Sequence, residues 1–178
     1  MRATIVVVLI LMLSLTALAA DKFQPLNVKT GLWEITLKIT TAGQMPISSE
    51  LLAKLSPEQR TRLEERMKVR QSQGDKTNTR TYKSCLTKEK LANDPFSDTN
   101  KGCTRTLLSS TSSKAEVRLN CVHGDVKTTG SVLIEALNTE NVKATGHMVS
   151  AGGGGGNTFN SDTNFTSKWI GSSCGNTK

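Results

Sequence analysis

The chain has 178 residues, a formal net charge of +8 at pH 7, four cysteines and only seven aromatic side chains. Nucleic acid is not expected as a partner, because no basic cluster is interleaved with the few aromatic residues. The positive charge suggests an anionic envelope surface, an acidic glycan or a phospholipid headgroup as a partner, and solubility alone is the simpler interpretation that we prefer.

The first twenty residues have the pattern of a secretory signal peptide. Arg2 precedes an apolar run that ends at Leu13, and small residues in an A-x-A arrangement follow. The run is too short for a stable membrane span, and the small residues suit signal peptidase. We expect cleavage after Ala19 or Ala20 and a periplasmic or secreted protein, with an uncleaved N-terminal anchor as the alternative.

Residues 21–178 are enough for a single β-rich domain with a sizeable core. The segment 31–40, GLWEITLKIT, opens this domain with apolar and polar residues in strict alternation. A period of two residues is typical of a strand that has one buried face and one wet face.

A helical insertion is predicted at residues 48–72. Its longer helix begins with a capping box, in which Ser56 caps the first turn and Gln59 reaches back to the backbone. A shorter, more apolar helix precedes it and is expected to lie on the sheet. The insertion either covers the open end of the sheet or presents Leu63 and Met67 to a partner or a membrane surface.

Six further strands are predicted after the insertion, at 77–87, 103–110, 114–122, 125–137, 141–150 and around 159–169. Gly130 and Gly146 are expected to mark a bulge or sharp curvature. A Gly-rich loop at 151–156 connects the last two strands as a flexible segment, and it lacks the helix start and Lys of a phosphate-binding loop. We predict a mainly β fold, a curled antiparallel sheet or open barrel-like meander of about seven strands.

The cysteines predict two disulfides. Long intervals separate them, so the close pairs typical of zinc sites are missing, and an even count suits an oxidising compartment. The four residues are Cys85, Cys103, Cys121 and Cys174.

The hairpin at 103–122 favours one pairing of these cysteines. We place Leu107 opposite Val117, which sets Ser109 opposite Ala115 and brings the cysteines at 103 and 121 together. The cysteines at 85 and 174 then form the second bridge. Pairing of 85 with 103 and of 121 with 174 stays open as the rival.

No pattern of catalytic or metal-binding residues stands out, so we expect no cofactor. His123 and His147 fall on different predicted strands without a ligand spacing. The segment 94–102 resembles a calcium loop but lacks the closing Glu. No serine has the G-x-S-x-G setting of a nucleophile elbow. A small hydrolase that uses His123 is therefore the weakest hypothesis.

Several motifs occur in a familiar order: GLWEIT at 31–36, Met-Pro followed by LSPEQRTRLEERM up to residue 67, CLT at 85–87, two single cysteines, and IGSSC at 170–174. In this order the chain resembles the bacterial exported family known as domain of unknown function 3617. The resemblance implies a secreted or periplasmic protein, mostly from Gram-negative bacteria, and it brings neither an activity nor catalytic residues.

The leading hypothesis is a noncatalytic binding module for an apolar or amphiphilic ligand or an envelope protein. The ligand would lie on the concave face near Trp33, Ile35, Phe165 and Trp169, for which an ordinary core is the alternative interpretation. The second hypothesis is an envelope interaction or assembly protein that uses the charged helix.

Overall fold

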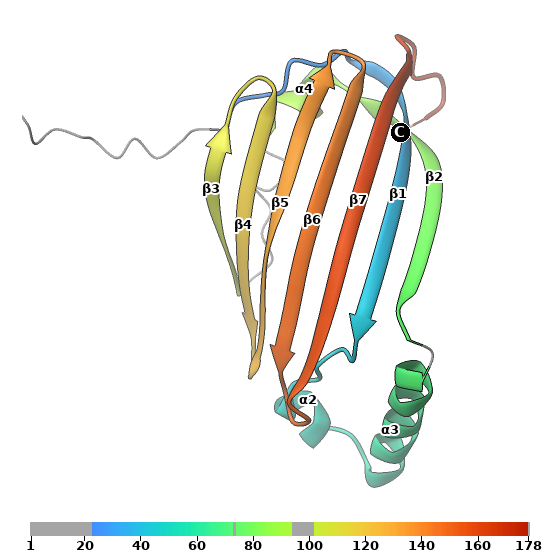
Figure 1. The fold of residues 1–178 in the computed structure, drawn as a ribbon, viewed down its shortest axis with the longest axis vertical. Coiled ribbons are helices and arrows are strands. Elements are labelled where there is room, and N and C mark those ends of the chain that lie inside the picture. Colours follow the sequence, from blue (N-terminus) through green and yellow to red (C-terminus); the bar gives the residue numbers. More distant parts are fainter. Residues whose placement is uncertain (1–22, 73, 94–101, 178) are drawn as a thin grey trace, which may run out of the picture.

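The computed structural model describes residues 23–72, 74–93 and 102–177 (Figure 1). The predicted signal peptide and nearly all of the calcium-like segment lie outside these ranges. Within the described ranges, no helix combines the length and the apolar character that crossing a membrane requires.

Seven strands form one antiparallel sheet that does not close into a barrel, which confirms the predicted fold class. The strands are β1 (Gly31–Gly43), β2 (Lys76–Leu86), β3 (Cys103–Ser110), β4 (Lys114–His123), β5 (Val126–Asn138), β6 (Asn141–Gly152) and β7 (Asn157–Gly171). Among the described residues, three helices accompany the sheet: α2 (Ser49–Ala53), α3 (Pro57–Ser72) and α4 (Lys88–Ala92).

The order of the strands is β2-β1-β7-β6-β5-β4-β3, so the last five strands form a meander to which the first two are added. β1 pairs with β7, and β2 and β3 lie at opposite edges of the sheet (Figure 1). The chain must therefore pass from one edge to the other between β2 and β3, and α4 begins that connection.

One face of the sheet is apolar and the other is polar, as the alternation predicts. On the apolar face Val117 and Trp33 are 0% and 3% exposed. On the polar face threonines meet across strands, for example Thr36 and Thr81 with hydroxyl oxygens 3.1 Å apart. Helices α2 and α3 lie at one end of the sheet and α4 at the other (Figure 1). We call the apolar side the inner face.

The start of α3 has the predicted capping box. The Ser56 amide donates to Gln59 Oε1 at 2.9 Å, and the Gln59 amide donates to Ser56 Oγ at 3.3 Å. α2 is tied to the β4–β5 turn, because both the amide and the hydroxyl of Ser49 donate to the Asp125 carboxylate. The Ser49 hydroxyl, followed by its amide, holds the pKa of Asp125 below the ordinary value.

The structure joins Cys103 to Cys121 and Cys85 to Cys174, the pairing that the hairpin register favours. Leu107 does lie opposite Val117. The prediction for Ser109 is wrong, because a bulge after Leu107 shifts the register by one residue and places Ser109 opposite Glu116.

The sheet has no register shift at Gly130 or Gly146, so a bulge there is wrong, and the alternative of sharp curvature stays a prediction. Gly130 has a different role. A Cβ at this position would overlap the carbonyl oxygen of His147 and the Met148 sulfur, so β5 and β6 approach closely there.

The Gly-rich connection between β6 and β7 contacts the segment before α2. The Gly154 amide donates to the Ile47 carbonyl at 3.2 Å, and Gly153 has a positive φ of 75°. A Cβ on Gly153 would overlap the Ile47 carbonyl oxygen. These glycines therefore allow close packing at this end of the sheet, which adds a contact role to the flexible connection predicted from the sequence.

A cavity under an N-terminal strap

Residues 23–30, here called the strap, cross one end of the inner face before β1 begins (Figure 1). Three amide donors of the strap bind the turns of the sheet. Gln24 donates to Ser110 Oγ at 2.7 Å, Asn27 to the Ser112 carbonyl at 2.6 Å, and Lys29 to the Thr139 carbonyl at 2.8 Å. The strap is thereby fastened to both the β3–β4 and the β5–β6 turns.

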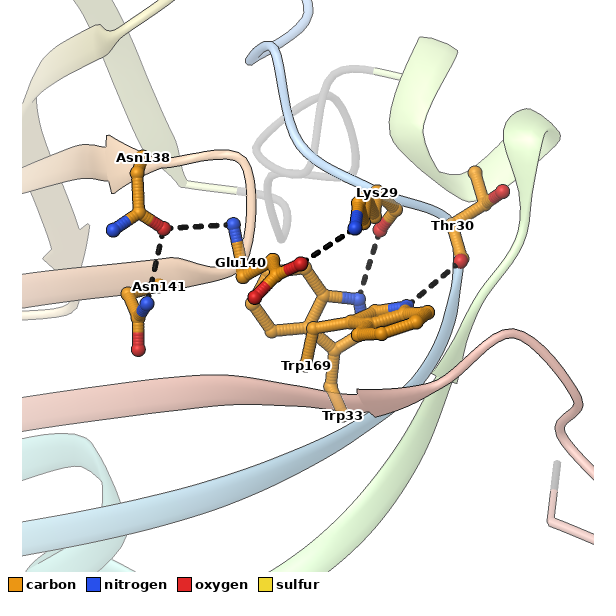
Figure 2. A network of polar contacts seen from close by, with 7 residues as sticks. All are labelled: Lys29, Thr30, Trp33, Asn138, Glu140, Asn141 and Trp169. Carbon is orange, nitrogen blue, oxygen red and sulfur yellow. Dashed lines mark hydrogen bonds and ion pairs between the residues drawn. The ribbon is translucent and has the colours of Figure 1, made fainter.

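Two tryptophans fasten the strap to the neighbouring strands β1 and β7 (Figure 2). The indole N–H groups of Trp33 and Trp169 donate to the carbonyls of Lys29 and Thr30, each at 3.0 Å. Lys29 also forms an ion pair with Glu140, and its Nζ lies 4.6 Å from the centre of the Trp169 ring. The two indoles on neighbouring strands thus bind successive carbonyls of the strap.

Between the strap, α4 and the inner face lies a cavity of about 290 Å³, here called the strap cavity. Its walls are mainly apolar. They include Phe23, Leu26 and Val28 from the strap, Leu91 from α4, and Ile134 and Val142 from the sheet.

Three of the four residues predicted for the concave face line this cavity, namely Trp33, Ile35 and Phe165. They come together because Ile35 and Phe165 lie on the paired strands β1 and β7, on the same face as Trp33. Trp169 lies opposite Trp33 but contributes to the strap contacts and not to the cavity wall. Trp33 belongs both to the core and to the wall.

Four polar side chains in the cavity wall were not predicted as site residues: Ser84, Lys90, Asn93 and Ser167. Ser84 is half-buried and Asn93 is exposed. Ser167 on β7 is 8% exposed, and its side chain has no hydrogen-bond partner among the residues that the structure describes. Lys90 on α4 is exposed and donates to the Cys85 carbonyl at 3.0 Å, so its ammonium lies where the cavity meets solvent. β7 is rich in Ser, Thr and Asn, so its sequence does not single out Ser167, and only the pairing of β7 with its neighbours shows what surrounds this residue.

The predicted partner face on α3 is partly covered. Leu63 and Met67 are half-buried and line a crevice of about 320 Å³ together with Ile47 and Leu52. Val69, by contrast, is 58% exposed on the same helix.

A histidine and an aspartate meet on the polar face. His147 Nδ1 lies 2.6 Å from Asp162 Oδ1, and Ser131 is opposite His147 on the next strand. The Ser131 side chain has no hydrogen bond to His147 in the structure. The three residues lie inside paired strands, so the local backbone amides serve the ladder and are not free to bind an oxyanion. His123 is exposed at the end of β4.

The sequence profile of the family described as protein of unknown function DUF3617 matches residues 28–174. The chain belongs to this family. The order of its sequence motifs predicted this membership. The matched region contains both disulfides and most of the residues that line the strap cavity. No curated protein and no solved structure matches the chain.

Proposed function

We propose that this DUF3617 protein is a noncatalytic binding module that holds a small apolar or amphiphilic ligand in the strap cavity. The observation that carries the proposal is a cavity of about 290 Å³ with mainly apolar walls. Ligand pockets typically range from about 300 to 1,000 Å³ and combine apolar walls with a few polar groups. This cavity is at the lower end of that range, which suits a small ligand or one end of a longer one.

The position of Lys90 supports an amphiphile with an anionic head. Lys90 is an exposed residue that also lines the cavity, and its ammonium donates to the Cys85 carbonyl. A carboxylate or phosphate head could replace or share this contact while the apolar part occupies the cavity.

The two disulfides suggest an oxidising compartment outside the cytoplasm. We propose that residues 1–20 are removed as a signal peptide, that residues 21–178 form the mature domain, and that the protein acts in the periplasm or after secretion.

A cavity-filling pair of variants tests the binding proposal. Val142→Trp adds bulk inside the cavity, whereas Val149→Trp adds the same bulk on β6 outside the residues that line it. We expect Val142→Trp to reduce the binding of the apolar dye N-phenyl-naphthylamine at least tenfold, and Val149→Trp to leave binding near the wild-type level. Equal dye binding by Val142→Trp and wild type would refute the proposal. Native mass spectrometry of protein from its host would then show whether a small molecule or a second polypeptide co-purifies.

The exposed part of α3 supports a second candidate, an envelope interaction or assembly protein. Val69 is 58% exposed and is flanked by Lys68 and Arg70 on the helix. We expect Val69→Asp to abolish capture of an envelope partner, with little effect on folding because the side chain is in solvent. Leu63→Asp combined with Met67→Asp is less specific, since both side chains are half-buried. A complex that survives all three substitutions would rule out this role for the helix.

A further inference from the structure

We infer that the ligand of the strap cavity carries a hydrogen-bonding oxygen that reaches Ser167 in the cavity wall. This inference rests on the proposed binding function and narrows the ligand from any apolar molecule to an oxygen-bearing one, such as an alcohol or a ketone. A pure hydrocarbon would leave the hydroxyl without a partner.

Ser167 is more than nine-tenths buried, with 8% exposure, and in the described part of the chain it is the one polar residue that is buried. Its neighbours across the sheet are Ile35 on β1 and Val142 on β6, neither of which can accept or donate a side-chain hydrogen bond. A buried hydroxyl without a partner is costly, so buried polar groups are nearly always paired.

One pair of hydroxyls on the inner face is satisfied within the protein, whereas the half-buried Ser84, Ser161 and Thr163 have no side-chain hydrogen bond among the described residues. Thr128 and Ser150, on β5 and β6, have hydroxyl oxygens 2.8 Å apart. Ser167 differs from these hydroxyl residues in its burial, because it is the buried polar residue of the described part of the chain and it lines the cavity. The Ser167 hydroxyl oxygen keeps some accessible surface, so a molecule in the cavity can reach it.

The ligand class follows from the chemistry of the wall. A serine hydroxyl both donates and accepts, so it can bind either a carbonyl oxygen or an alcohol. The remaining wall is mainly apolar and selects a hydrocarbon body. Ser84, Lys90 and Asn93 also line the cavity, but all three are more exposed than Ser167, so Ser167 is the polar contact for the most deeply buried part of the ligand.

The test measures how well octanol and octane displace N-phenyl-naphthylamine from the mature chain, residues 21–178. We expect Ser167→Ala to reduce the preference for octanol over octane by about 3- to 10-fold, the range of one net hydrogen bond. Ser167→Thr keeps the hydroxyl and should retain the preference. Ser161→Ala is the matched control, because Ser161 is on the same strand and the same face but does not line the cavity.

The outcomes separate this inference from the proposed function. If the dye binds and Ser167→Ala leaves the ratio of octanol to octane affinity unchanged, the role of Ser167 is wrong while the binding function stands. If neither the wild type nor any variant binds the dye, the binding function itself fails. The melting temperature of the ligand-free protein is a further readout: we expect it to stay or rise in Ser167→Ala, and a fall would show that the hydroxyl serves the fold.

Discussion

The two disulfides close loops of very different length, since Cys85 and Cys174 are 89 residues apart and Cys103 and Cys121 are 18 apart. In the chain-entropy account, a cross-link stabilises by restricting the unfolded chain, and the effect increases with the logarithm of loop length. That account gives about 4.6 kcal/mol for the longer loop and about 3.2 kcal/mol for the shorter one. Replacing Cys85 and Cys174 by Ala should therefore destabilise the protein by about 1.4 kcal/mol more than replacing Cys103 and Cys121 by Ala.

The topology gives the longer bridge a further role. It joins the end of β2 to the segment after β7, and these two strands lie on either side of β1. The shorter bridge joins residues that β3 and β4 already place opposite each other. Loss of the Cys85–Cys174 bridge should therefore loosen the β2 edge and the cavity wall to which Cys85 belongs.

Urea unfolding followed by far-ultraviolet circular dichroism, without reductant, measures both double variants against the wild type. A difference of 1 kcal/mol corresponds to about 2–4 °C in melting temperature for a domain of this size, so thermal scans should separate the two variants. If the Cys103–Cys121 variant is as unstable as the Cys85–Cys174 variant, loop length does not control the effect and the reasoning is refuted.

Three other predictions concern close packing, pH and the strap. Gly130→Ala should destabilise by about 1–3 kcal/mol, because its Cβ would overlap backbone of the next strand; a urea midpoint equal to the wild type would contradict this close approach. The hydrogen bonds from Ser49 hold the pKa of Asp125 low in the folded state. Their contribution to the free energy of unfolding is therefore present above the ordinary Asp pKa of about 3.9, and it is lost as the pH falls through the lowered folded pKa. The unfolding free energies of wild type and Asp125→Ala should accordingly differ at neutral pH and converge in acid; a constant difference would show that ionisation has no part. Trp169→Phe removes one indole donor to the strap and should cost about 1 kcal/mol, with faster amide exchange at Lys29; unchanged exchange would show that the strap does not depend on this bond.

Much of the fold was readable from short stretches of sequence. Alternation around Trp33 predicted a strand with one buried face, and the spacing of Ser56 and Gln59 predicted a helix start that the structure shows atom by atom. The register at Val117 brought the cysteines of one hairpin together. The bulge after Leu107 was missed, because Leu107 and Leu108 are both apolar, so the alternation does not show at which residue the register shifts.

The candidate site was only partly predictable. Ile35 and Phe165 were expected to share a face, and they do line one cavity. The state of Ser167 was missed, since burial and the lack of a partner depend on which strands lie beside it. The contact between His147 and Asp162 likewise depends on the pairing of β6 with β7.

The sequence by itself determined where the strands and helices form, which residues of each strand share a face, and that the cysteines act as cross-links. These properties follow from the period of a pleated chain and from capping within a few residues. The tertiary structure decided that β1 pairs with β7, that the strap and α4 cover one end of the inner face, and that a serine is left unpaired in the resulting cavity. Contacts between segments more than a hundred residues apart depend on how the whole sheet assembles, which no local pattern records.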